Sequence, residues 1–313
     1  MRVTNNMKNN SLVNSMMKNQ SLTGNLQAQL ASGNKLNSAS DNPSAIPSVM
    51  NANEMLNKIS TYTDNITYLN GEIEVAESTL GQITDQIQRV KTLTIEAANG
   101  TNSSEQLKLI NDELKQIREQ LVDLANTKYQ NSTIFSGNKT GKLPYVIEEK
   151  GAITYNGTPA NENYQRAYTI ADGVTLSINV CGENVLGYSN LVSEGPPAVF
   201  EGQGIMHTIN TLTTMLDSAN PDQKEISLKL DELETAQKTV LAARTELGGA
   251  QTRLNLTQEL HEENKITYSA IQENLQSIDI AKVISELSAQ EVALQASLYV
   301  GSQVMDISLL DYV

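Results

Sequence analysis

Apolar side chains recur in steps of three and four residues along residues 46–98. A row sustained over this length predicts one coiled-coil-type helix, about 80 Å long at 1.5 Å per residue. Such a helix is too long for a compact domain of this size, so it predicts a rod. The row consists of Ala52, Met55, Ile59, Tyr62, Ile66, Leu69, Ile73, Ala76, Leu80, Ile83, Ile87, Val90, Thr94 and Ala97.

A second helix is expected directly after the first. Gly100 suits the position that ends a helix, and Ser103 or Ser104 suits the cap that begins the next. The new row runs from Leu107 to Leu124, again in steps of three and four. The connection is short, so the two helices are predicted to form an antiparallel hairpin.

The C-terminal third carries a repeat of seven residues. After a helical piece from about residue 203, Asn220-Pro221 predicts a break, and a long helix follows from about 222. Its repeat runs from Ile226 to Leu275, and alanines at companion positions are expected to let a neighbouring helix approach closely. The predicted core of the rod is Ile59, Ile66, Ile73, Leu80, Ile87, Leu114, Leu121, Leu233, Val240 and Leu247.

Between the helices, the pattern changes to short alternating runs separated by turn residues. Strands are expected at 145–147, 153–155, 167–170 and 176–180, with turns at Asn156-Gly157 and Asp172-Gly173. The predicted fold class is mainly α with a small β insert. The N- and C-terminal regions form a long antiparallel, coiled-coil-like rod. The expected domains are a rod of 46–140 and 204–275, a β-rich insert of 141–203, and terminal assembly helices of 1–45 and 276–313.

The two ends of the chain are expected to pair with each other. Residues 1–60 hold five basic and two acidic residues, whereas residues 258–313 hold two basic and nine acidic residues. Opposite charge beside matching apolar rows favours pairing of unlike helices. The ends are rich in Asn and Ser, which are weak helix formers, so we expect them to be disordered in the monomer and to fold in an assembly. The expected assembly interface is Leu12, Met16, Leu26, Leu30, Ile280, Ile284, Leu287, Leu294 and Leu298.

Composition excludes several classes of function. One cysteine and two histidines leave no material for a disulfide framework or a histidine-rich metal site. His261-Glu262-Glu263-Asn264-Lys265 lacks the second histidine of a zinc protease, and residues 137–143 lack the spacing and hydroxyl of a phosphate loop. We therefore predict no catalytic, cofactor-binding or metal-binding residues, and no enzyme.

Charge and hydropathy bear on partners and location. The net charge of −14 argues against nucleic acid and anionic membranes, and no apolar run is long enough to span a bilayer. The N-terminus lacks the continuous apolar stretch of a Sec signal peptide. These features fit a cytosolic protein, or one exported by another route.

Several segments together resemble the flagellin family. At the N-terminal end they are Leu30-Ala31-Ser32-Gly33-Asn34-Lys35-Leu36, Ala39-Ser40-Asp41-Asn42-Pro43 and Ala97-Ala98-Asn99-Gly100-Thr101. At the other end, residues 247–254 are similar to the family's Asn-Arg-Leu segment, although Thr252 stands where Asn is usual. The resemblance covers about residues 1–140 and 205–313.

Within that family, other segments resemble the branch that joins hook to filament. They are Leu124-Ala125-Asn126-Thr127, residues 134–140 and the ending Ser308-Leu309-Leu310-Asp311-Tyr312-Val313. The resemblance implies an extracellular place in the flagellum, at the hook–filament junction, and export through the flagellar channel. The implied partners are neighbouring copies, another hook-associated junction protein, flagellin, and an export chaperone that binds the C-terminal region. Flagellin itself and a cytosolic helical adaptor remain alternatives.

Overall fold

The chain divides into two compact units. The rod unit comprises residues 61–261, and the terminal unit comprises residues 1–60 and 262–313. The computed structural model describes residues 5–38, 40–99, 102–139, 141–148, 151–159, 166–178, 180–193, 199–218 and 221–310.

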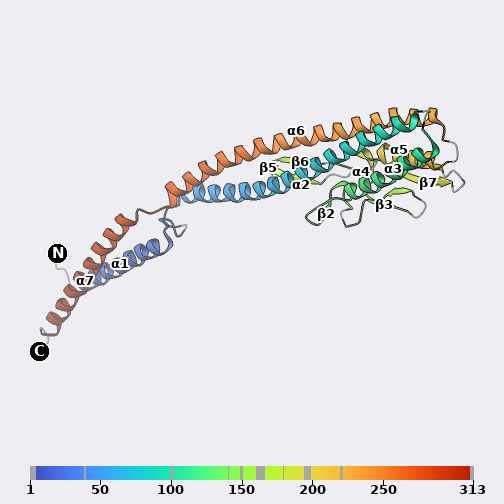
Figure 1. Cartoon of the computed structure of the whole chain (residues 1–313). Helices are drawn as coiled ribbons and strands as arrows, with labels where there is room; N and C mark the ends of the chain where they lie inside the picture. The colour runs from blue at the N-terminus through green and yellow to red at the C-terminus, as the bar shows by residue number, and fades with distance from the viewer. Residues whose placement is uncertain are drawn as a thin grey trace. The chain divides into compact units, whose positions relative to one another are not determined.

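Helix α2 (Ile46–Ala98) turns back into helix α3 (Ser104–Ala125), as the sequence predicts (Figure 1). Ser103 begins α3 with a capping box, in which its side chain accepts from the backbone of Gln106 and the Gln106 side chain accepts from the Ser103 backbone. Arg89 and Glu113 form an ion pair of 2.6 Å between the two helices. Both residues lie nine positions from the nearer helix end, so the pairing is antiparallel.

Helix α6 (Gln223–Gln276) follows α2 in the opposite direction through the rod unit. Its contacts with α2 appear in reverse order. The Asn70 amide donates to Asn255, Arg244 pairs with Glu77 at 2.6 Å, and the Lys91 ammonium donates to Gln237. The polar contacts lie at the edges of the helix pair and leave the centre to apolar side chains.

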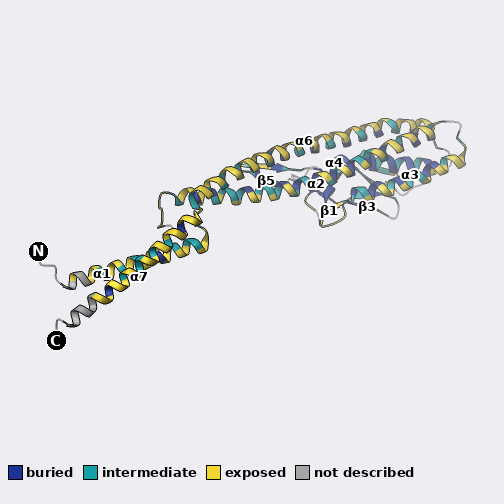
Figure 2. Ribbon diagram, turned by 60° about the vertical axis from the view of Figure 1, so that its left-hand side comes forward, coloured by how far each residue is buried: buried dark blue, intermediate teal, exposed yellow. Residues whose placement is uncertain are grey.

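The centre of the rod unit is a row of fully buried aliphatic side chains on α2. Ile66, Leu69, Ile73, Leu80 and Ile87 expose none of their surface. Figure 2 shows buried positions along α2 and exposed positions along the outer side of α6. The ten expected core residues are all buried, namely Ile59, Ile66, Ile73, Leu80, Ile87, Leu114, Leu121, Leu233, Val240 and Leu247.

The insert consists of short strands and short helices. One antiparallel sheet has four strands in the order β3-β4-β7-β8, and two further sheets pair β1 with β2 and β5 with β6. The elements are β1 (Lys128–Tyr129), β2 (Ser132–Thr133), η1 (Ile134–Ser136), β3 (Tyr145–Ile147), β4 (Ile153–Tyr155), β5 (Ala167–Ala171), β6 (Val174–Ser177), α4 (Gly182–Val185), β7 (Tyr188–Ser193) and β8 (Val199–Gln203). Helix α5 (Gly204–Asp217) follows and packs on α3 and on the four-stranded sheet.

The insert shares one hydrophobic core with the rod helices. Phe135 and Tyr145 are buried in it together with the α2 and α3 rows. Arg166 forms an ion pair of 2.6 Å with Glu72 of α2, whose side chain is only 3% exposed. The insert and most of the rod helices thus lie in one compact unit, and the division into rod, insert and terminal domains stays a prediction.

The predicted fold class, mainly α with a small β insert between long helices, is confirmed. The expected strands at 145–147, 153–155 and 167–170 correspond to β3, β4 and β5. The expected strand at 176–180 is wrong in its bounds, because β6 begins at Val174, directly after the Asp172-Gly173 turn, and ends at Ser177. Strands β7 and β8 were not predicted.

The terminal unit holds helices α1 (Asn5–Ser32) and α7 (Ile280–Leu310), which pack against each other. The ends of α2 and α6 also belong to this unit, where Gln272 donates to the Asn53 side chain over 2.8 Å. Both terminal segments are helical in the structure. Their disorder in the free monomer stays a prediction about the chain in solution.

A large-to-small substitution in the buried row tests the rod core. Leu80→Ala removes a fully buried side chain and is expected to lower the free energy of unfolding by about 3 kcal/mol. Leu109→Ala, at a side chain that is 69% exposed, is the matched control and is expected to change it by less than about 0.5 kcal/mol. Urea unfolding followed by circular dichroism measures both, and equal losses for the two variants would contradict the assignment of the core.

Candidate assembly interface

Helices α1 and α7 form an antiparallel pair. A side chain at Gly301, late in α7, would lie 3.5 Å from Leu12 and Met16, early in α1. Near the middle, the Asn19 amide donates to the Ser297 hydroxyl over 2.8 Å. Beyond the facing ends of the two helices, Asn34 forms an isolated β-bridge with Ser277. The order of these contacts reverses along the two helices.

Each helix turns one row of buried or half-buried residues toward the contact, in alternating steps of four and three. This spacing is the seam of a coiled coil. Its middle is polar on both helices, which limits how much apolar surface the pair buries by itself. The row on α1 is Leu12, Met16, Asn19, Thr23, Leu26 and Leu30, and that on α7 is Val283, Leu287, Gln290, Leu294, Ser297 and Gly301.

The structure separates the expected interface residues into two groups. Six of them lie in the seam of the pair, namely Leu12, Met16, Leu26, Leu30, Leu287 and Leu294. The other three, Ile280, Ile284 and Leu298, are 60%, 50% and 51% exposed. The expected interface leaves out Gln290 and Ser297 because it follows apolar residues only, and it leaves out Val283 because it places Ile280 and Ile284 in the seam instead. Alternating steps of four and three residues, counted from Val283 to Gly301, identify all three positions.

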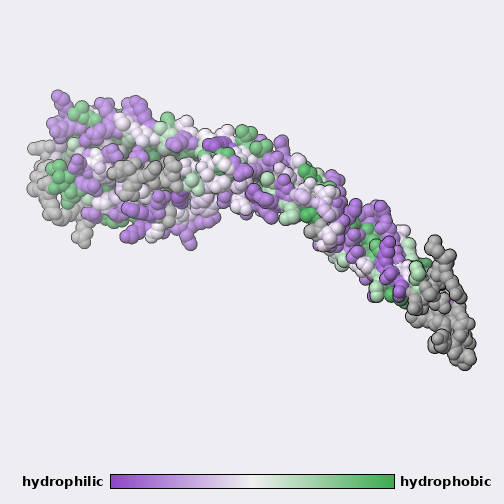
Figure 3. All heavy atoms as spheres, turned by 180° about the vertical axis from the view of Figure 1, so that it is seen from behind, coloured by the Kyte–Doolittle hydropathy of each residue, from purple (hydrophilic) through white to green (hydrophobic). Residues whose placement is uncertain are grey.

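The outer sides of the pair carry further apolar side chains, which Figure 3 shows among polar neighbours on the surface of this unit. On α1 the exposed ones are Met7, Val13, Met17 and Leu22. On α7 they are Ile280, Ile284, Val292, Leu298, Tyr299 and Val300. Apolar side chains collected on one small unit are typical of a surface that another molecule covers.

Among the described side chains, hydrogen bonds and apolar contacts join α1 and α7. The two ends pair as predicted, but among the side chains that the structure describes no ion pair joins the helices. Lys18 on α1 is exposed, and Glu286 on α7 lies 3.9 Å from Lys282 of its own helix. The exposed Lys18 and Glu291 are available to other molecules.

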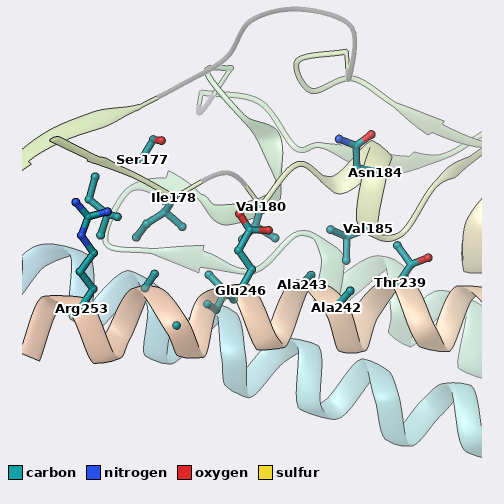
Figure 4. Close-up of a pocket in the computed structure, with 14 residues that line it drawn as sticks. Ser177, Ile178, Val180, Asn184, Val185, Thr239, Ala242, Ala243, Glu246 and Arg253 are labelled. Carbon is teal, nitrogen blue, oxygen red and sulfur yellow. The ribbon is translucent and has the colours of Figure 1, made fainter.

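In the rod unit, a groove of about 480 Å³ runs between α6 and the insert (Figure 4). Ala243 and Ala250 of α6 line one wall, and Ile178 and Val185 line the other. Across the groove from these alanines stand residues beside strand β6 and in helix α4, and the close approach of a longer helix at the alanines stays a prediction. Glu246 and Arg253 stand at the groove as well.

The two histidines and the single cysteine are packed among other side chains and backbone groups. His261 is 5% exposed, stacks on Tyr62, and its Nε2 lies 2.6 Å from the carbonyl oxygen of Ile170. Burial, and then the neighbouring Lys229, lowers the pKa of His207. Cys181 is buried, and its thiol donates to the Thr158 carbonyl over 3.4 Å.

Within the ranges given above, no three His, Cys, Asp or Glu side chains stand together as a metal-ion site would require. Across the same ranges, no helix has the length and hydropathy needed to span a membrane.

Comparison with known proteins gives matches to flagellar proteins. Residues 3–140 match the bacterial flagellin N-terminal helical region. Flagellar hook-associated protein 3 of Escherichia coli K12 is 27% identical over 297 residues, which cover 90% of each chain. Flagellin of Bacillus subtilis is 24% identical over 306 residues, which cover 95% of this chain and 94% of that one.

A solved structure shows the same fold. Flagellar hook-associated protein 3 from Legionella pneumophila has a TM-score of 0.61, with 17% identity and coverage of 72% of this chain and 98% of that one. The predicted family is thus supported by the N-terminal match, by a relative along nine-tenths of the chain and by the fold. The N-terminal part of the chain thus matches the flagellin family, and along most of its length the chain is similar to hook-associated protein 3.

Proposed function

We propose that this protein is a structural part of the bacterial flagellum that links the hook to the flagellin filament. The observation that carries the proposal is the similarity to hook-associated protein 3 over nine-tenths of both chains. The sequence led to the same conclusion through residues 124–127, 134–140 and 308–313.

The two units suit different parts of this role. The rod unit has a closed apolar core, with the α2 row fully buried between α3, α6 and the insert. The terminal unit instead keeps apolar side chains such as Val292 and Leu298 on its surface. Neighbouring copies, or the molecules above and below them, would cover these side chains and remove apolar surface from water.

The partners that follow are copies of the same chain, another hook-associated junction protein, and flagellin. The exposed Lys18 on α1 and Glu291 on α7 can attract unlike ends of adjacent molecules. An export chaperone would cover the C-terminal region before export, since α7 exposes the larger share of apolar side chains. The protein would lie outside the cell, exported through the flagellar channel.

The role requires no catalysis. The relatives named above are flagellar proteins, and the histidines and the cysteine take part in packing and hydrogen bonds. Flagellin remains the second candidate, because the Bacillus subtilis flagellin also matches along almost the whole chain.

Immunogold labelling of isolated flagella distinguishes these candidates. An antibody against this chain is expected to label a narrow band at the joint of hook and filament. Label along the whole filament would identify a filament subunit instead. Flagella without label would show that the protein is not a component of the flagellum. Flagella from a strain that lacks the gene provide the background.

Charged substitutions on the outer side of α7 test the interface. Val292→Asp and Leu298→Asp change side chains that are 66% and 51% exposed, so the free energy of unfolding is expected to change by less than about 0.5 kcal/mol. Incorporation into flagella, measured by immunoblot of purified flagella, is expected to fall at least about tenfold, because a carboxylate would be buried without a partner.

Gln295→Asp is the matched control for these variants. It adds the same charge to an exposed position of the same helix without removing an apolar side chain. The Gln295→Asp variant is expected to be incorporated into flagella nearly as well as the unchanged protein. A loss as large as that of Leu298→Asp would mean that charge alone, and not buried apolar surface, governs assembly at this face.

A further inference from the structure

A polar layer crosses the seam of α1 and α7 at Asn19. Its side-chain amide donates to the Ser297 hydroxyl over 2.8 Å, and the Gln290 amide donates to the Asn19 side-chain oxygen over 3.1 Å. One turn later, Thr23 is 8% exposed and donates to the Asn19 carbonyl over 3.0 Å. The amide of Asn19 therefore has two partners on α7 that lie seven residues apart, or about two turns.

The apolar part of the seam does not by itself fix the register of the two helices. Leu287 and Leu294 are seven residues apart. If α7 slips by seven residues along α1, Leu287 therefore takes the place of Leu294 opposite α1. Apolar contacts are not directional, and the seam would look similar to α1 after such a slip. The distinguishing positions are the polar ones and Gly301, which lies against Leu12 and Met16.

A slip that brings Leu294 to the place of Gly301 would carry Ser297 away from Asn19. Val283 would come to the place of Gln290, and Gln290 to that of Ser297. A half-buried amide would then lose one of its two hydrogen-bond partners to an aliphatic side chain. The unmade bond is expected to disfavour the slipped register by roughly tenfold.

We propose that Asn19 is the positioning residue that sets the register of α1 against α7, at a cost in the stability of the pair. A polar residue at one seam position of a coiled coil acts in this way, since it bonds well in a single alignment. The register in turn determines which exposed side chains of the two helices stand together as one surface. The inference concerns the helix pair itself, so its failure would leave the proposed function standing.

Cysteine pairs in the full chain read the register directly. Leu12→Cys with Gly301→Cys reports the register of the structure, and Leu12→Cys with Leu294→Cys reports the slipped one. The second pair is separated by about 10 Å along the helix axis in the native register, too far for a disulfide. Cys181 is buried and stays in place. Equilibration in a glutathione redox buffer gives the effective concentration of the two thiols in each variant. This measurement works even when α1 and α7 are associated only part of the time.

With Asn19 present, the native pair is expected to have an effective concentration at least about tenfold above that of the slipped pair. In the background of Asn19→Leu the ratio is expected to fall to within about threefold of unity, since leucine fits either register. Asn25→Leu, at an exposed position of α1, is the matched control and is expected to keep the tenfold preference. A ratio near one with Asn19 present, or a preserved preference in Asn19→Leu, would overturn the proposal.

Discussion

The packing of α2 between α3, α6 and the insert is the contact on which the rest of the rod unit depends. Residues such as Ile66, Ile73 and Leu80 expose no surface, because neighbours cover α2 on several sides. Helix α6 contributes a buried side chain every seven residues, including Leu233 and Val240, and apart from the buried Ala236 its other residues are half-buried or exposed. The insert closes the remaining side, held by the buried ion pair of Glu72 and Arg166. The unit thereby completes its core without a partner.

The terminal unit follows the opposite principle. Its two helices share a seam whose middle holds Asn19, Thr23, Gln290 and Ser297, so less apolar surface is buried within the chain. Apolar side chains such as Tyr299 remain outside, at 67% exposure. The helix pair thus has polar groups in its seam and apolar groups on its outer sides, and neighbouring molecules would bury these apolar groups. This arrangement suits a protein that passes through an export channel and is ordered at its place of assembly.

The sequence predicted those parts of the fold in which burial and periodicity coincide. The rows through Ile73 and Leu121 are buried at most of their positions, and Ser103 forms the cap expected there. Strand β7 is not predicted from the sequence, because its run Tyr188-Ser189-Asn190 is polar. Its position in the sheet follows from its pairing with β4 and β8. Likewise, Ile280 and Ile284 look like seam residues in the sequence. Their outward position follows from the packing of Val283 and Leu287, which only the structure shows.

Hydrogen exchange measured by mass spectrometry, on the dilute chain and on isolated flagella, tests this division of the molecule most directly. Residues 1–40 and 280–313 are expected to exchange freely in the dilute chain and to become protected in flagella, whereas α2 and α3 of the rod unit are expected to be protected in both. Strong protection of the terminal segments in the dilute chain would contradict the account, because the pair would then be complete without neighbours.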